Sequence, residues 1–174
     1  MTQTATDPGL FPPDSIEAFL RFCAGEWMSL RSRFALEDPV GAISALDAEE
    51  TAEGDEWHSS ERGELVVTYL EPEPGVGPGG LSVGPKGEPP RQLQFAADGA
   101  FSAGDQQGRW QLWPDGSLEL TLSIGEGELR ERIWFTKPNL RLRSTLQSAA
   151  DGSPSRASFC SEIRRVSRPA AASA

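Results

Sequence analysis

The stretch SLELTLSI, residues 117–124, decides the fold class because apolar and polar side chains alternate along it without a break. The leucines and the isoleucine share one face of an extended chain, and the serines, the glutamate and the threonine share the other. A period of two residues is typical of a β-strand with one buried face. We therefore predict a strand here, with its apolar face in the core.

Short β-rich segments lie on both sides of this strand. The predicted strands cover residues 27–36, 65–70, 92–97, 100–103, 108–113, 117–124, 128–136, 139–146 and 157–166. Several are separated by sequences suited to tight turns, such as Asp98-Gly99 and Asp151-Gly152, so neighbouring strands are expected to pair antiparallel. Residues 71–90 are rich in proline and glycine and lack periodicity, so we expect a long mobile loop there. Residues 40–50 stay ambiguous, because they are alanine-rich and acidic and helical by propensity.

One amphipathic helix is predicted ahead of the strands. Asp14 is the expected N-cap, Glu17 follows three residues later, and Gly25 ends the helix. Between them apolar residues recur at helical spacing, namely Ile16, Phe19, Leu20 and Cys23.

One helix followed by eight to ten antiparallel strands with short connections indicates a meander closed into a barrel. A barrel of this size encloses space for one small ligand. The alternative is a flat sandwich, which is less favoured because Greek-key variation in connection length is not evident. We expect a single domain at residues 14–167, between a disordered lead-in at 1–13 and a frayed tail at 168–174.

The composition of the chain argues against several classes of binding partner. The 174 residues carry 16 Lys and Arg against 26 Asp and Glu, a formal charge of -10. An acidic chain is repelled by phosphate backbones and anionic bilayers, so no nucleic-acid or membrane partner is expected. The N-terminus lacks secretory-signal features and no apolar run approaches a membrane span of about 20 residues, so a cytoplasmic location is expected. Cys23 and Cys160 are expected to be reduced thiols, with a single bridge as the alternative.

Two arginines alternate with two leucines in the C-terminal third, at Leu140-Arg141-Leu142-Arg143. One interpretation places the leucines inside and the arginines in water. The other places the arginines in a wet cavity and the leucines against a partner. Arginine suits a carboxylate ligand because its guanidinium donates two parallel hydrogen bonds. The pattern alone leaves both interpretations open.

Three longer strings resemble the S/U-type phycobiliprotein lyases, the bilin lyases. They are GEWMSLRS at residues 25–32, ERIWFTKPNLRLR at 131–143 and ASFCSEIR at 157–164. The resemblance implies an all-β, lipocalin-like barrel, similar to fatty-acid-binding proteins, with about ten antiparallel up-and-down strands and one N-terminal α-helix. It also implies an enzyme that binds an open-chain phycobilin, phycocyanobilin or phycoerythrobilin, and promotes its attachment to a cysteine of an apo-phycobiliprotein subunit.

The same resemblance implies roles for particular residues. Glu162 and Glu131 are the expected catalytic carboxyl groups, facing the pyrrole nitrogens. The expected ligand-binding residues are Arg141, Arg143 and Arg31 for the propionates and Trp134 for the pyrrole rings, with Trp27, Trp110 and Tyr69 as weaker candidates. The bilin is substrate, so no cofactor is expected, and no metal site is expected either.

One departure from the family pattern bears on activity. Family members often carry a histidine shortly after the first-strand arginine, where this chain has Arg33-Phe34-Ala35. A bilin carrier, or a non-catalytic partner subunit of a heterodimeric lyase, is therefore the alternative function, and a homodimer and a heterodimer with a paralogue are both open. The only histidine, His58, is expected to be a solvated loop residue.

Overall fold

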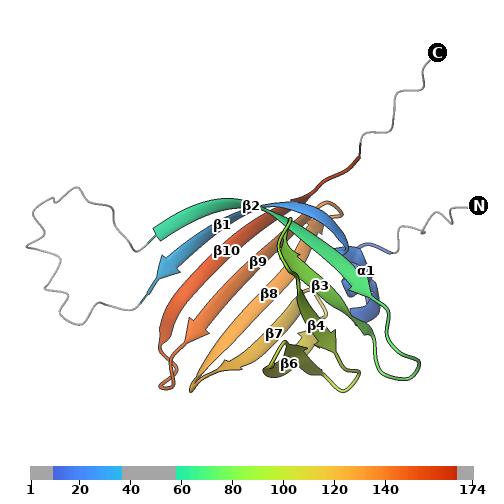
Figure 1. Cartoon of the computed structure of the whole chain (residues 1–174). Coiled ribbons are helices and arrows are strands. Elements are labelled where there is room, and N and C mark those ends of the chain that lie inside the picture. Colours follow the sequence, from blue (N-terminus) through green and yellow to red (C-terminus); the bar gives the residue numbers. More distant parts are fainter. Residues whose placement is uncertain (1–9, 37–57, 168–174) are drawn as a thin grey trace, which may run out of the picture.

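The structure is a computed structural model, and it describes residues 10–36 and 58–167. These residues form one helix and ten strands: α1 (Ile16–Cys23), β1 (Gly25–Ala35), β2 (His58–Leu70), β3 (Gly79–Pro85), β4 (Arg91–Phe95), β5 (Ala100–Ala103), β6 (Gln106–Leu112), β7 (Leu118–Ile124), β8 (Gly127–Lys137), β9 (Leu140–Ser148) and β10 (Pro154–Arg164). Each strand pairs antiparallel with its neighbour in sequence, and β1 pairs with β10 to close the barrel (Figure 1). The predicted up-and-down barrel with one N-terminal helix is confirmed. The ambiguous segment at residues 40–50 and most of the two predicted tails lie outside the described residues.

Strand β3 lies inside the stretch that was expected to be a loop, so that expectation was wrong. Glycine is required in this strand because neighbouring backbone atoms leave no room for a Cβ atom, and not because the segment is flexible. A Cβ atom on Gly80 would lie 2.4 Å from the Leu93 carbonyl oxygen, and one on Gly84 would lie 2.8 Å from Pro90 Cα. Glycine permits this approach of strands because it has no side chain. The strand still buries Leu81 in the core.

The helix begins one residue later than expected. Ser15 is the N-cap, and its hydroxyl accepts a hydrogen bond of 3.2 Å from the Ala18 backbone N–H. A serine at this position satisfies a backbone donor that has no partner within the helix. The prediction of Asp14 as the cap was wrong.

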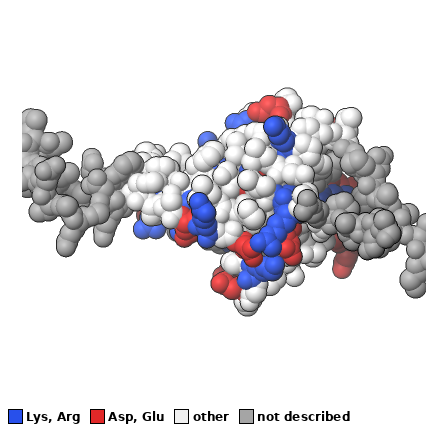
Figure 2. Space-filling view, turned by 90° about the horizontal axis from the view of Figure 1, so that it is seen from above, with Lys and Arg blue, Asp and Glu red and all other residues white. Residues whose placement is uncertain are grey.

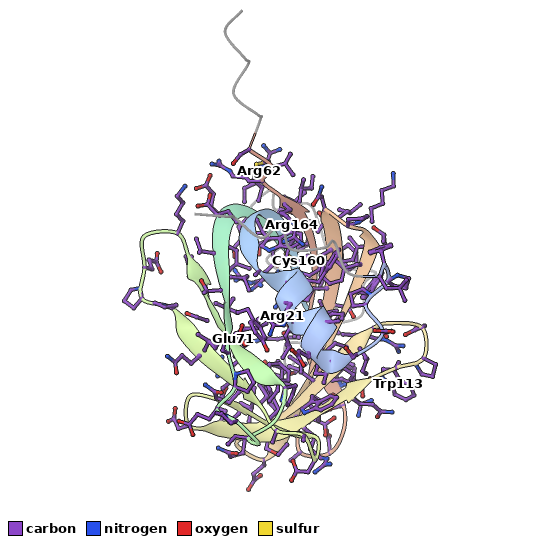
Figure 3. The ribbon with its side chains drawn as sticks, turned by 90° about the vertical axis from the view of Figure 1, so that its right-hand side faces the viewer. Arg21, Arg62, Glu71, Trp113, Cys160 and Arg164 are labelled. Atoms are coloured by element: carbon purple, nitrogen blue, oxygen red, sulfur yellow. The ribbon has the colours of Figure 1, made fainter. Side chains whose placement is uncertain are left out.

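Helix α1 lies across one end of the barrel (Figure 3). It buries Phe19, Leu20 and Cys23 completely. The rings of Phe19 and Phe22 lie 5.3 and 4.8 Å from the ring of Phe135 on β8, in edge-on contacts. Because this apolar face packs onto the inward-facing side chains of the strands, the helix covers that end of the barrel.

The barrel interior has two unlike halves. Strands β4 to β8 contribute most of the apolar core, including Leu118, Leu120, Leu122, Phe95 and Phe101. Strands β1, β9 and β10 instead turn polar and charged side chains inward, and Arg141 and Glu162 are each only 1% exposed. Buried charges are costly unless they are paired. The polar half is therefore the region to examine for a functional site.

Candidate functional site

The register of three neighbouring strands brings the charged residues together. Arg141 on β9 lies opposite Glu162 on β10, and Arg143 lies opposite Cys160. Cys160 in turn lies opposite Arg31 on β1. Directly paired residues of antiparallel strands project on the same face. The barrel therefore gathers these side chains inside, although they come from both ends of the chain.

An ion-pair network links the buried groups. The Arg141 Nε donates a short hydrogen bond to Glu162 Oε2. Arg143 bridges two carboxyl groups, with Nη1 2.7 Å from Glu131 Oε1 and Nη2 3.4 Å from Glu162 Oε1. We call these four residues, together with the half-buried Arg31 that lies opposite Cys160 on β1, the buried charge cluster.

Two guanidinium donors of this cluster lack a partner. Within the described part of the chain, Arg141 Nη2 and Arg143 Nε are buried and donate to no hydrogen-bond acceptor. Most buried polar atoms in folded proteins are hydrogen-bonded. Three guanidinium groups against two carboxyl groups also leave the cluster one positive charge in excess. Both observations give the cluster the capacity to hold an anionic group.

The charges and the burial of the cluster shift the pKa values of its carboxyl, guanidinium and neighbouring thiol groups. Burial alone would raise the pKa of Glu162, but Arg143 and Arg141 outweigh it and hold that pKa below its usual value. The pKa of Arg143 is raised, because its two carboxyl partners outweigh the effect of burial. The pKa of Cys160 is raised by burial and by Glu162, against a smaller opposite effect of Arg31. The Cys160 thiol is therefore kept protonated, whereas Glu162 is kept as a carboxylate.

Trp27 holds the deep side of the cluster in place. The guanidinium carbons of Arg141 and Arg164 lie 4.5 and 4.2 Å from the centre of its indole ring, which is 1% exposed. The indole Nε1 donates to the Cys23 carbonyl at the end of the helix, at 2.9 Å. Arg164 also donates to the Phe22 carbonyl, and Figure 3 shows it beside the helix. Cation–π contacts of this kind fix a guanidinium by its flat face.

An open cavity of about 400 Å³ lies at the end of the barrel away from α1, and none of the cluster's five residues is among those that line it. Small-molecule sites commonly measure about 300–1,000 Å³. Polar side chains from β2, β9 and β10 and two arginines supply much of its wall. Its lining comprises Arg33, Phe34, Ala35, Ser59, Leu129, Thr145, Gln147, Arg156, Ala157 and Ser158. Most of these residues continue the inward-facing rows of Arg31, Arg143, Glu131 and Cys160, two or four positions further along each strand.

The model of the CpeS-like protein family matches residues 97–165. Chromophore lyase CpcS/CpeS 1 of Paulinella chromatophora is 44% identical over 161 residues, which cover 91% of this chain and 93% of that relative. The chain belongs to the CpcS/CpeS chromophore lyase family. A second family member, chromophore lyase CpcS/CpeS 2 of Synechococcus sp. strain JA-3-3Ab, is 32% identical over 75% of this chain and 62% of its own length. The resemblance drawn from the sequence strings is thereby confirmed.

Solved structures agree on the fold. The S-type phycobiliprotein lyase CPES from Guillardia theta superposes with a TM-score of 0.64 at 19% identity, covering 88% of this chain and 94% of that one. A protein of the DUF3598 family from Nostoc punctiforme gives a TM-score of 0.53 at 12% identity, over 84% of this chain and 49% of its own. Among the residues described here, no helix of this family member is long and apolar enough to cross a membrane.

Five of the six main candidate residues of this CpcS/CpeS protein form the buried charge cluster. The sixth, Trp134, lies elsewhere. It projects from the outer face of β8, opposite Leu142, with its ring 6.4 Å from that of Phe159. The interpretation that placed Leu140 and Leu142 inside and Arg141 in water is wrong, because Arg141 is buried.

Of the weaker candidates, Trp27 lies against the cluster, whereas Trp110 and Tyr69 have other surroundings. Trp110 donates to the Ala96 carbonyl at 2.8 Å, and Tyr69 donates to the Pro78 carbonyl at 2.7 Å, both against the apolar half of the barrel. His58 is exposed, as expected, but it is the first residue of β2 rather than a loop residue. Its ring stacks on that of Phe34, at 4.9 Å.

Sequence reasoning missed the polar lining of the open cavity. Thr145 and Gln147 follow Arg143 at intervals of two residues on β9. Ser158 precedes Cys160 by the same interval on β10. The alternation that places Arg141 and Arg143 on one face therefore carried the signal for these residues as well.

Proposed function

We propose that this chromophore lyase binds an open-chain bilin, such as phycocyanobilin or phycoerythrobilin, non-covalently in the barrel and promotes its thioether attachment to a cysteine of a phycobiliprotein subunit. The observation that carries the proposal is the pair of buried, unpartnered guanidinium donors inside a barrel that has an open cavity at one end. A bilin combines conjugated pyrrole rings with two propionate groups, so it requires both a cavity and buried cations. The printed names of the relatives support the same substrate class.

In this proposal the arginines of the cluster bind the propionates, and Glu162 stabilises the protonated pyrrole nitrogens. Arg141 and Arg143 offer their unpartnered donors to a propionate, and Arg31 adds a third cation from β1. Glu162, held as a carboxylate by its arginine neighbours, faces the pyrrole nitrogens and stabilises their protonated form. A protonated ring system is the better electrophile at its ethylidene carbon.

The bond-forming step then needs no nucleophile from this chain. The thiolate of the acceptor cysteine adds to the ethylidene carbon, and the electron pair released by that addition moves into the conjugated system, where a protonated pyrrole nitrogen receives it. The protein contributes orientation and electrostatic stabilisation. The raised pKa values of Cys23 and Cys160, both caused mainly by burial, support this division because buried thiols are poor nucleophiles.

Two measurements test the proposal in sequence. Phycocyanobilin titrated with excess protein should shift and sharpen its long-wavelength absorption band, because the cavity selects one conformation and the cluster stabilises the protonated form. An apo-phycobiliprotein subunit is then added, and the mixture is denatured. Bilin should remain attached to the acceptor and not to this chain. An unchanged absorption spectrum would contradict the ligand assignment.

The second candidate is a bilin carrier, or a non-catalytic subunit of a heterodimeric lyase. One observation favours it: the only histidine in the sequence, His58, stacks on Phe34 at the outer face of the strands, and the described cavity lining contains no histidine. Bilin binding without transfer, followed by transfer when a paralogue is added, would identify the subunit. Binding without transfer in either mixture would identify the carrier.

A further inference from the structure

Strands β1, β8, β9 and β10 expose apolar side chains on the outside of the barrel. Met28, Leu30, Leu146, Phe159 and Ile163 are 47%, 44%, 40%, 42% and 53% exposed, respectively. The strand register makes them neighbours, since Met28 lies opposite Ile163, while Leu142 lies opposite both Ser161 and Trp134. We call the set Met28, Leu30, Trp134, Leu142, Leu146, Phe159 and Ile163 the apolar face.

The apolar face inverts the usual pattern of a barrel strand. Antiparallel sheets that meet water commonly alternate apolar residues inward with polar residues outward. Here β9 and β10 point Arg141, Arg143 and Glu162 inward and leucine, phenylalanine and isoleucine outward. The helix does not cover this surface, because α1 packs onto the barrel end and β2 and β3. Large exposed apolar patches on folded proteins commonly mark interaction sites.

A hollow of about 480 Å³ lies on the apolar face. It is lined by Phe159 and Leu146 and by the two arginines Arg130 and Arg132, with Glu119 at its edge. Each arginine is ion-paired on the surface, Arg130 with Glu128 and Arg132 with Asp115, both at 3.0 Å. Such exposed pairs are weak, so Arg130 can exchange Glu128 for an incoming carboxylate. Arg132 is also held by a hydrogen bond of 2.9 Å from its Nε to Ser117 Oγ, and it offers its charge at the surface from this fixed position.

The hollow and the cavity border each other at the rim of the barrel. They share four lining residues, Phe34, Thr145, Ala157 and Ser158. A protein seated on the apolar face would therefore have part of its surface next to the cavity opening. Figure 2, which looks down on the strands at the top of Figure 1, shows charged side chains in separate groups with uncharged surface between them.

We propose that the apolar face is the docking surface for the acceptor subunit, which contributes an apolar patch with carboxylate groups that meet Arg130 and Arg132. This inference rests on the proposed function. The rim position favours the acceptor over a second copy of this chain, because a transfer reaction requires the acceptor thiol at the cavity opening, whereas self-association has no such requirement.

The test compares the parent with the triple variant Met28→Thr, Phe159→Thr, Ile163→Thr, which keeps β-forming residues at exposed positions. The matched control is Val76→Thr, since Val76 is 63% exposed in the turn between β2 and β3. The affinity for phycocyanobilin is measured by absorption, and transfer is measured against rising concentrations of an apo-phycobiliprotein β subunit. We expect an unchanged bilin affinity and at least a 10-fold rise in the acceptor concentration needed for half-maximal transfer. The control should match the parent.

A second variant tests the charges. Arg130→Gln with Arg132→Gln should also raise that acceptor concentration, and should make transfer less sensitive to salt, because screened charge pairs are lost. Parent-like transfer by the triple variant would overturn the docking surface and leave the lyase proposal intact. Light scattering of the parent and the triple variant tests self-association. If the parent is a dimer, the triple variant is a monomer and transfer is unchanged, the face serves self-association and the inference is overturned. A parent that transfers no bilin would overturn the proposed function, and the docking surface with it.

Discussion

Glu162 is a buried carboxyl group whose charge is kept by its neighbours, and this predicts a pH dependence. Its folded-state pKa is lowered, so its contribution to stability is fully present above the unfolded value of about 4.3 and is lost as pH falls through the folded value. Glu162→Gln removes one partner of a buried pair, which costs about 3–5 kcal/mol near neutral pH. Urea unfolding of parent and variant should therefore differ most at pH 7 and progressively less toward pH 3.

The exposed substitution Glu128→Gln is the control, and it should change the unfolding free energy by less than about 0.5 kcal/mol. A gap between parent and Glu162→Gln that stays constant down to pH 3 would mean that Glu162 is not held as a carboxylate.

A substitution of Arg141 tests the ligand site, also at the scale of a single residue. Arg141→Ala removes a donor to a charged group, worth about 1.5–3 kcal/mol, so bilin affinity should fall roughly 10- to 100-fold. Isothermal titration or absorption measures the affinity, and circular dichroism checks the fold. Arg109→Ala, which removes an arginine from the outer face of β6, should leave the affinity unchanged. A folded Arg141→Ala variant with the parent's affinity would show that the cluster does not hold the ligand.

The residue-scale predictions from sequence succeeded where strand alternation applied and failed where it was ignored. Arg141 and Arg143 are two positions apart and do share the interior. Trp134 is three positions from Glu131, and this odd spacing places the two side chains on opposite faces of β8. Which face of β9 is the inner one could not be predicted, because it depends on pairing with β10 and, through β10, with β1 at the other end of the chain.

The helix cap is a prediction at the scale of an element. Ser15→Ala removes the only side-chain bond to the start of α1 that the described residues supply, at a cost of about 1 kcal/mol. For a chain of this size the melting temperature should fall by about 2–4 °C. Asp14→Ala, one residue earlier, should leave it within about 1 °C. A larger effect of Asp14→Ala than of Ser15→Ala in thermal unfolding would return the cap to Asp14.

The helix cap shows why the exact boundary of an element was hard to predict, and strand β3 shows that composition can also conceal the type of an element. Glycine and proline are typical of loops, and β3 uses glycine for close strand contact instead, so its composition concealed it. Asp14 and Ser15 are both good capping residues, and only the backbone geometry selects one of them. Strands with clear alternation, such as β7, were located to within a residue or two.

The whole molecule is expected to transfer bilin without using its own thiols. Cys23→Ala combined with Cys160→Ala tests this, and alanine is chosen because both positions are buried. The double variant should transfer bilin to the acceptor at the parent's rate, as measured by covalently bound chromophore after denaturation. A folded, bilin-binding double variant that no longer transfers would demonstrate a relay through one of these cysteines, and the direct mechanism would be wrong.

The helix across one end of the barrel has a further consequence for a long, thin ligand. A barrel that is closed at one end gives a long ligand one orientation, because the end of the ligand that enters first lies deepest and the other end lies at the opening. The deep end here offers the indole of Trp27 and the stacked guanidinium of Arg141, and the outer end offers hydroxyl and amide groups. For the proposed function, a linear bilin would therefore enter from the end away from α1, and only its trailing end would remain within reach of a second protein.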